Sequence, residues 1–242
     1  MIWAVRSVIC LPTYDERENL ESMVRALGEL RLEGLEVLII DDASPDGTGE
    51  IADGLAAELP WVHVLHRERK EGLGPAYLAG FARALELGAD FVFEMDCDFS
   101  HDPADVPRLA AAVEKADLVL GSRYVSGGGT RNWGLVRRFI SRGGSLYAQV
   151  LLQLGIRDLT GGFKCYRRKV LETIDLDAID SRGYAFQIET TYRAIRAGFR
   201  VVEIPITFAD RQVGGSKMSR SIVLEGIWKV PALRLRALTN RL

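Results

Sequence analysis

Short apolar runs rich in valine and isoleucine alternate, through the first half of this chain, with segments whose apolar residues recur at helical spacing. The apolar runs occupy residues 7–11, 37–40, 62–65, 91–95 and 118–120. Consecutive strands joined by a helix usually pair in parallel, because the helix carries the chain back across the sheet. We therefore predict an α/β fold in which a mainly parallel sheet is flanked by helices.

The segments between the apolar runs carry signals of helix starts. Thr13 and Glu16 have the spacing of a capping box, and Pro75 and Pro103 can each occupy a first helical turn. In parallel sheets of this kind, the functional side chains lie in the loops that follow the carboxyl ends of the strands. The loops before these helices are therefore the places to look for a site.

The pattern changes after residue 123. The later elements are expected as a glycine-rich loop at 127–129, helices at 135–154 and 185–197, a strand at 201–208, and an amphipathic segment from 219. We find no internal repeat and no low-complexity linker. A single domain over residues 1–242 is predicted, made of two halves, 1–123 and 124–218, and a final amphipathic segment, 219–242.

Composition excludes several classes of protein. A 242-residue chain with 48% hydrophobic residues can bury a large core. Its net charge of −2 lacks the overall positive charge that is typical of proteins that bind nucleic acids. Its three cysteines, at positions 10, 97 and 165, are odd in number and far apart, which favours reduced thiols in the cytoplasm. No signal peptide or membrane-spanning stretch is expected.

Three clusters of acidic and polar residues directly follow predicted strands, at residues 12–16, 41–48 and 96–101. The carboxyl ends of parallel strands meet at one edge of a sheet, so the clusters should converge on one crevice. Several carboxylates in one crevice need a cation, and oxygen ligands suit Mg²⁺ or Mn²⁺ shared with substrate phosphates. Asp96 and Asp98 are the central pair, although such a triplet alone is equally consistent with a solvated turn.

Seven segments occur in the order LPTYDERENL, VLIIDDASPDGT, KEGLGPAYLAGF, EMDCDFSHDP, GSRY, DLTGGFKCYRR and GYAFQIE. Together they resemble the family 2 glycosyltransferases of GT-A (Rossmann-like) fold, and among these the polyprenol-phosphate mannosyltransferases, also called dolichol-phosphate mannose synthases. The resemblance implies an enzyme that transfers mannose from GDP-mannose to a dolichyl-type polyprenyl phosphate, with inversion. It also implies that residues 1–123 bind the nucleotide sugar and residues 124–218 the acceptor.

The resemblance assigns a set of residues to the donor nucleotide. They are Pro12, Tyr14, Glu16, Asp41, Asp42, Asp96, Arg211 and Lys217. The chemistry agrees, since Tyr14 can stack and carboxylates can accept hydrogen bonds from guanine or ribose. Other readings stay open: helix capping for Glu16, a solvated turn for Asp41 and Asp42, and a surface turn for the segment from Arg211 to Lys217.

The same resemblance implies a metal site made by Asp96, Asp98 and Ser100. Many relatives carry glutamine where this chain has Ser100, so a hydroxyl would have to replace that amide or act through water. Cys97 should point away from the metal by strand alternation, and His101 is expected to belong to the loop rather than to the ligands.

Arg123, Arg137 and Ser141 are implied as the site for the acceptor phosphate. Guanidinium groups suit phosphate, and residues 137 and 141 share one helical face, although a solvated basic face is the alternative. Asp98, Arg123 and Glu189 are the expected catalytic residues. A phosphate acceptor is already ionised at neutral pH, so Glu189 is not strictly required as a base and could instead orient the sugar or a basic residue.

A lipid acceptor implies contact with a membrane, for which the sequence offers residues 146–154 and 222–242. Core packing explains these segments equally well. We expect the protein at the cytoplasmic face of a membrane, and the sequence leaves open a separate membrane-anchor protein. Two alternatives remain: a family 2 enzyme moving glucose or N-acetylglucosamine to a lipid phosphate or saccharide, and a nucleotide-sugar-binding module without catalysis. A Rossmann oxidoreductase is disfavoured, because the first strand lacks a glycine-rich turn.

Overall fold

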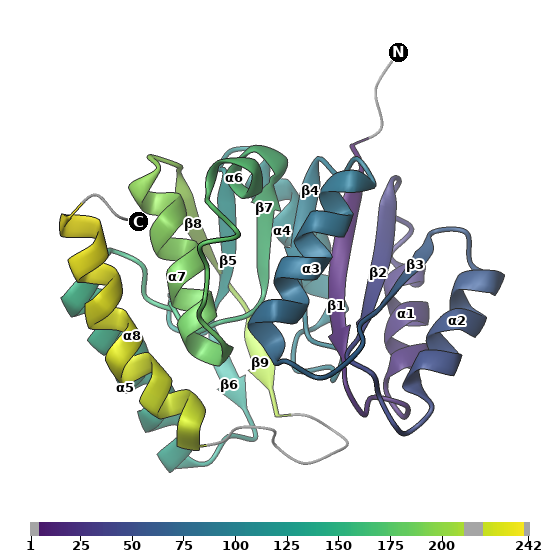
Figure 1. Ribbon diagram of the computed structural model, residues 1–242, viewed down its shortest axis with the longest axis horizontal. Helices are drawn as coiled ribbons and strands as arrows, with labels where there is room; N and C mark the ends of the chain where they lie inside the picture. The colour runs from purple at the N-terminus through teal and green to yellow at the C-terminus, as the bar shows by residue number, and fades with distance from the viewer. Residues whose placement is uncertain (1–4, 211–219, 240–242) are drawn as a thin grey trace.

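The computed structural model describes residues 5–210 and 220–239 and is built on one seven-stranded sheet (Figure 1). Its strands are β1 (Ser7–Thr13), β2 (Leu35–Asp41), β3 (Val62–His66), β4 (Phe91–Glu94), β5 (Leu118–Ser122), β7 (Lys164–Arg167) and β8 (Val201–Pro205). Their order is β3-β2-β1-β4-β7-β5-β8, and β7 runs antiparallel to both neighbours while the other pairs are parallel. The predicted mainly parallel sheet is confirmed.

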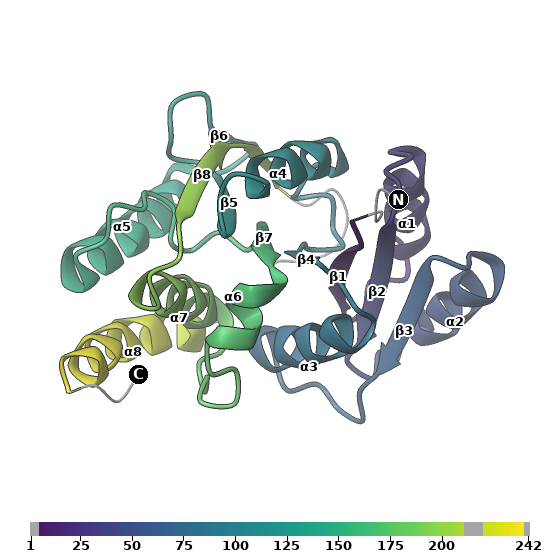
Figure 2. The same cartoon turned by 90° about the horizontal axis from the view of Figure 1, so that it is seen from above.

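Helices cover both faces of this sheet (Figure 2). They are α1 (Leu20–Glu29), α2 (Thr48–Glu58), α3 (Leu73–Glu86), the 3₁₀ helix η1 (Pro103–Asp105), α4 (Val106–Val113), α5 (Leu135–Leu152), α6 (Arg168–Thr173), α7 (Gly183–Arg196) and α8 (Arg220–Leu238). Along β1, Val8 and Cys10 point into the core under α3 and α7, whereas Ile9 and Leu11 point into the core under α1 and α4. Strand alternation thus gives the molecule two apolar layers.

The second half differs from the expectations in two places. The glycine-rich loop expected at 127–129 runs directly into strand β6 (Gly129–Arg131), which was not expected and which pairs in parallel with β9 (Thr207–Ala209) in a small second sheet. The single strand expected at 201–208 is broken at Ile206, whose amide donates to the carbonyl of Ser122 at 3.0 Å before the chain enters β9. Neither β7 nor α6 was expected.

The expected capping box is also wrong. Thr13 is the last residue of β1, and α1 begins only at Leu20. Glu16 instead accepts a hydrogen bond from the side-chain amide of Asn19 at 2.8 Å. The two proline signals are confirmed, because Pro75 lies in the first turn of α3 and Pro103 opens η1.

Helix α8 packs against α5 and α7 (Figure 1). It buries Val230, Leu233 and Ala237. Its Glu225 accepts a hydrogen bond from the amide of Arg182 at 2.7 Å, just before α7. Over residues 5–210 and 220–239, no helix is apolar for long enough to cross a bilayer.

Candidate active site

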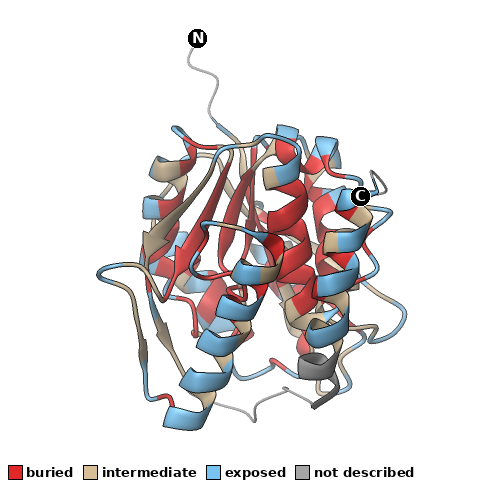
Figure 3. Cartoon of the chain, turned by 90° about the vertical axis from the view of Figure 1, so that its left-hand side faces the viewer, coloured by how far each residue is buried: buried red, intermediate tan, exposed pale blue. Residues whose placement is uncertain are grey.

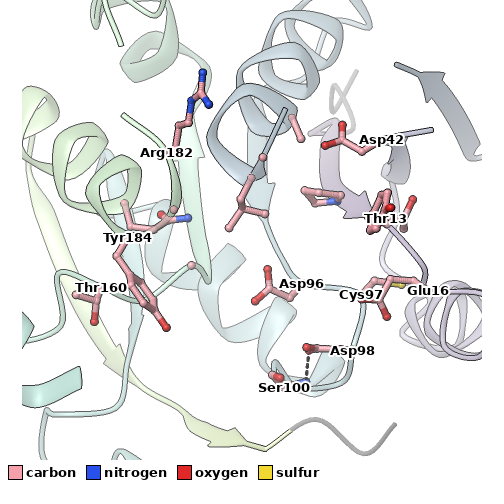
Figure 4. Close-up of a pocket in the computed structure, with 18 of the residues that line it drawn as sticks. Thr13, Glu16, Asp42, Asp96, Cys97, Asp98, Ser100, Thr160, Arg182 and Tyr184 are labelled. Carbon is pink, nitrogen blue, oxygen red and sulfur yellow. Dashed lines mark hydrogen bonds between the residues drawn. The ribbon is translucent and has the colours of Figure 1, made fainter. Parts of the chain in front are cut away.

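A cavity of about 400 Å³ opens where β1, β2, β4 and β5 end. Tyr14, Asp42, Asp98 and Arg123 line it, one from the loop after each of these strands. In Figure 4, Asp42 and Glu16 lie on one side of the acidic triplet and Tyr184 on the other. The convergence predicted from the strand ends is therefore observed.

Four of the residues that we expect to contact the nucleoside lie at the cavity wall. Pro12, Tyr14, Glu16 and Asp42 all line it. The ammonium of Lys70 lies 3.5 Å from the centroid of the Tyr14 ring, a cation–π contact that fixes the ring at the cavity wall. An aromatic face, carboxylates and a lysine together suit a nucleoside diphosphate.

Asp41 does not line the cavity, which corrects its expected contact with the nucleoside. Its Oδ1 accepts a hydrogen bond from the Ser44 hydroxyl at 2.6 Å and another from Thr13 at 3.3 Å, and its Oδ2 accepts from the Ser44 amide. Asp41 therefore holds the turn after β2, while Asp42 reaches the cavity and pairs with Arg67.

The acidic triplet, Asp96-Cys97-Asp98, lies at the cavity on the loop after β4 (Figure 4). Asp98 Oδ1 accepts a hydrogen bond from the Ser100 amide at 3.0 Å, and Asp96 Oδ1 accepts from the Tyr77 hydroxyl at 3.4 Å. These bonds hold both carboxylates in place. Ser100 and Cys97 are both buried and both line the cavity, and Cys97 also packs in the core beneath α1 and α4.

The donor set fits a divalent cation that is shared with a substrate. Within the described residues, no group of three His, Cys, Asp or Glu side chains forms a complete metal site. Mg²⁺ and Mn²⁺ are commonly held by one or two carboxylates and completed by substrate phosphates and water. Asp96 and Asp98 supply that number of carboxylates, with the Ser100 hydroxyl beside them.

His101 bonds to the backbone of Asp96. Its Nδ1 accepts a hydrogen bond from the Asp96 amide at 3.1 Å, and its ring stacks on Phe163 with centroids 4.9 Å apart. Burial lowers the pKa of His101 to about 4, against the opposing effect of Asp98. The imidazole is therefore neutral at pH 7, as an acceptor at Nδ1 must be.

Arg123 lines the cavity but is already paired. Its Nε and one terminal nitrogen donate to the two oxygens of Asp158 at 2.7 and 2.6 Å, and the same terminal nitrogen donates to the Thr160 hydroxyl at 2.9 Å. Burial opposes the charge of Arg123, but Asp158 outweighs burial and raises the pKa of the guanidinium. The cation is fixed in place before any acceptor arrives.

Arg137, on α5, places a second guanidinium at the cavity wall, and we call Arg123 and Arg137 the basic wall. Its guanidinium lies over the Trp133 ring, 4.3 Å from the centroid, and pairs with Asp210. Ser141 does not line the cavity. Its hydroxyl accepts a hydrogen bond from Tyr124 at 2.8 Å, so of the two α5 residues expected at the acceptor phosphate, Arg137 lines the cavity and Ser141 does not.

Glu189 is absent from the cavity wall, which corrects its expected catalytic position. It is fully buried in α7, pairs with Arg193 at 2.8 Å and accepts a hydrogen bond from Ser181. Of the roles that the sequence left open for this carboxylate, the orientation of a basic residue is the one observed, since Glu189 pairs with Arg193. Gln187, two residues closer to the start of α7, lines the cavity instead.

Sequence reasoning missed several residues of the cavity. Trp133, Thr160, Arg182 and Tyr184 line it without having been expected there. The segments GYAFQIE and DLTGGF pointed to the right stretches of chain, but not to the side chains that reach the cavity. The expected donor contacts Arg211 and Lys217 lie outside the described residues.

Comparisons with known proteins agree with this geometry. The family model described as glycosyl transferase family 2 matches residues 8–175. The undecaprenyl-phosphate mannosyltransferase of Micrococcus luteus is 51% identical over 96% of this chain and 96% of its own length. The polyprenol monophosphomannose synthase of Mycolicibacterium smegmatis is 49% identical over 98% of this chain and 89% of its own length.

Solved structures share the fold. Glucosyl-3-phosphoglycerate synthase from Mycobacterium tuberculosis, in complex with Mn²⁺, UDP-glucose and phosphoglyceric acid, superposes with a TM-score of 0.68 at 18% identity, covering 95% of this chain and 79% of that one. At this identity the likeness concerns the fold alone, and it agrees with the GT-A architecture. The match of the family model and the two close relatives show that this chain belongs to glycosyl transferase family 2 and is a glycosyltransferase.

Proposed function

We propose that this enzyme transfers mannose from GDP-mannose to a polyprenyl phosphate, giving polyprenyl-phosphate mannose and GDP. The observation that carries the proposal is one cavity that Asp96 and Asp98 share with Tyr14, which we call the nucleoside wall, and with Arg123 and Arg137, the basic wall. The names of the two close relatives support mannose as the sugar and a polyprenyl phosphate as the acceptor.

The proposed reaction is a direct displacement with inversion. An oxygen of the acceptor phosphate forms a bond to the anomeric carbon, while the bond from that carbon to the diphosphate of GDP breaks. Asp96 and Asp98 would hold Mg²⁺ or Mn²⁺, which would supply positive charge for the departing diphosphate. The acceptor is already ionised, so no proton has to be removed, and this agrees with the absence of Glu189 from the cavity wall.

The basic wall would hold the acceptor by electrostatics and geometry. Asp158 fixes the plane of the Arg123 guanidinium, and Trp133 and Asp210 fix that of Arg137. Positioned guanidinium groups lower the barrier without reorganising during the reaction. Arg123 and Arg137 therefore act as positioning groups for the phosphate, and Ser141 contributes through Tyr124.

Removal of a carboxylate tests the metal site. We expect Asp98→Ala, and chelation of the wild-type protein with EDTA, to lower transfer from GDP-mannose by about 100-fold or more. The matched control is Asp102→Asn in the same loop, since Asp102 caps η1 and does not line the cavity. Full transfer activity of folded Asp98→Ala would exclude this mechanism.

The outer face of α5 and α8 supports a lipid acceptor. Its exposed apolar side chains are Leu135, Val136, Phe139, Ile140, Leu146, Val150, Ile227, Trp228, Leu235 and Leu238. Phe139 is 82% and Trp228 is 77% exposed. Figure 3 shows α5 as a largely exposed helix. We call these ten residues the apolar face and propose that it lies on the cytoplasmic surface of a membrane, with or without a separate anchor protein.

Two further features favour a membrane over core packing for the apolar face. The exposed arginines Arg138 and Arg142 alternate with the apolar residues of α5, as in helices that lie in an anionic interface. Arg137 extends from the same helix into the cavity, so a lipid phosphate at this surface would be close to the basic wall.

Vesicle co-sedimentation tests the apolar face. We expect Phe139→Ser combined with Trp228→Ser to weaken binding to phosphatidylglycerol vesicles by about a hundredfold or more, since each removes about 1.5–3 kcal/mol of apolar burial. Val5→Ser is the control, because Val5 is 46% exposed but distant from these helices in sequence. Equal binding by all variants would contradict the proposal.

A panel of donors separates the remaining candidates. GDP-mannose, UDP-glucose and UDP-N-acetylglucosamine are each offered with a short polyprenyl phosphate. Mannosyl product with GDP-mannose supports the proposal. Product with another donor identifies the alternative family 2 activity, and binding without any product would identify a binding module.

A further inference from the structure

Gln187 places a buried and incompletely satisfied amide at the cavity wall. It lies in α7, is 2% exposed and lines the cavity wall. Within the described part of the chain, neither its Oε1 nor its Nε2 makes a hydrogen bond of normal geometry. Native proteins rarely leave a buried amide unpaired, because desolvation without a partner is costly. Such a group at a cavity wall indicates a ligand that completes it.

The backbone of Gln187 is fixed by a buried lysine. Lys164, in β7, donates to the carbonyl of Gln187 at 2.8 Å and to the Thr190 hydroxyl at 3.0 Å. Lys164 in turn faces Glu94, its cross-strand neighbour. The amide is therefore attached to a rigid element, and its position is set before the ligand binds.

The side chain that can accept a hydrogen bond from this amide is Glu94. Burial raises the pKa of Glu94, and Lys164, Tyr166 and Gln187 each oppose that rise. Glu94 Oε1 accepts a hydrogen bond from the Tyr166 hydroxyl at 2.7 Å, whereas its Oε2 is unpaired within the described residues. One amide proton of Gln187 is directed toward Glu94, in keeping with its effect on the pKa of that carboxyl. The Oε1 atom and the second amide proton of Gln187 are left for a ligand.

The surroundings of Gln187 suit a neutral ligand group. An uncharged amide that both donates and accepts matches hydroxyl groups, whereas phosphate is better served by the arginines across the cavity. The backbone of Gly162 lies beside this amide and carries no side chain, and a Cβ on Gly162 would lie 3.3 Å from Gln187 Nε2. The missing side chain leaves room beside the amide.

We infer that Gln187 binds hydroxyl groups of the transferred sugar and contributes to the choice of sugar. This inference rests on the proposed function, because the sugar would lie between the carboxylates that hold the diphosphate and the arginines that hold the acceptor. Tyr184, on the same helix and also at the cavity wall, would cover the sugar from the α7 side.

Gln187→Met tests the inference, since methionine keeps the length of the side chain and removes both polar atoms. The donor is the nucleotide sugar that the wild-type protein turns over. We expect kcat/KM to fall by about tenfold to hundredfold, as when a site built for a hydroxyl loses its partner. Affinity for GDP alone should stay within about twofold of the wild type, because the nucleoside wall is unchanged.

Deoxy donors identify the contact directly. In the wild type, removal of one ring hydroxyl from the donor should lower kcat/KM by the same factor as Gln187→Met does. In Gln187→Met, the same deoxy donor should lower kcat/KM little further. The melting temperature of Gln187→Met should be equal to or above that of the wild type, because an unpaired buried amide has been removed. Gln149→Met, which alters an amide outside the cavity that bonds to the carbonyl of Arg157, is the control.

Three results would overturn the inference. They are wild-type kcat/KM in Gln187→Met, a parallel loss of GDP affinity, and a clear fall in melting temperature, which would assign the amide to the fold. Failure of the proposed function is distinguishable, because it shows in the wild-type protein as turnover of a different nucleotide sugar, on which the same comparison is then made.

Discussion

Asp158→Asn should destabilise this protein far more than the loss of an ion pair at its surface. Asp158 is fully buried and accepts three hydrogen bonds from Arg123: two from the guanidinium and one, at 2.9 Å, from the backbone amide. Asparagine can keep the backbone contact, but it leaves the guanidinium charge buried without a counterion. Removing one partner of a buried pair costs about 3–5 kcal/mol.

The comparison variant is Glu58→Gln. Glu58 pairs with Arg25 at 3.1 Å, and both side chains are about half exposed, so solvent screens the pair. Its loss should cost no more than about 1 kcal/mol. Urea unfolding of the two variants and the wild type, followed by circular dichroism, gives both free energies of unfolding from the same assay.

A double variant separates the pair from its surroundings. In Arg123→Met with Asp158→Asn, the uncompensated charge is gone, so the protein should be more stable than Asp158→Asn alone. Two results would show that the reasoning about a preset cation is wrong. One is a free energy of unfolding for Asp158→Asn within about 1 kcal/mol of the wild-type value. The other is a double variant that is less stable than Asp158→Asn by as much as Arg123→Met alone destabilises the wild type.

Other consequences concern packing, charge and the nucleoside wall. Gly80→Ala should cost about 1–3 kcal/mol of unfolding free energy, because its Cβ would lie 2.6 Å from Ile40, whereas Gly54→Ala, with nothing within 4 Å, should be neutral or slightly stabilising. Burial lowers the pKa of Lys164 to about 8 from a usual 10.5, so the unfolded chain holds more protons between these values. Stability should therefore rise with pH across that window by up to about 3 kcal/mol relative to Lys164→Met. Lys70→Met should weaken GDP binding several-fold in calorimetry, and unchanged affinity would contradict the role of the lysine over the Tyr14 ring.

Much of the fold could be predicted because the parallel strands are apolar on both faces. Each strand from β1 to β5 was expected within a few residues, and helices α5 and α7 were expected within two residues of their observed ends. Strand β7 was missed because its four residues, Lys164–Arg167, begin and end with a charged side chain. Lys164 is buried only through partners from β4 and α7, which the local sequence does not reveal.

The site was predictable at the level of loops, less so at the level of side chains. Asp41 and Asp42 are adjacent, and only the turn after β2 decides that the first bonds to Ser44 and the second reaches the cavity. Gln187 and Glu189 lie two residues apart on α7, and so point in different directions. The family pattern drew attention to the carboxylate, whereas the geometry favours the amide.

The position of β7 between β4 and β5 has a consequence for how the chain folds. Strands β1 to β4 can pair as soon as residue 94 has left the ribosome, since each has a partner among the others. Strand β5 pairs with β7 and β8, both of which are synthesised later, so it must wait for a long loop to close. The nucleoside wall belongs to the early part and the basic wall to the late part, and the two meet only when β7 enters the sheet. We therefore expect the cavity to be completed only after β7 has entered the sheet, so that a chain lacking β7 would have no complete site.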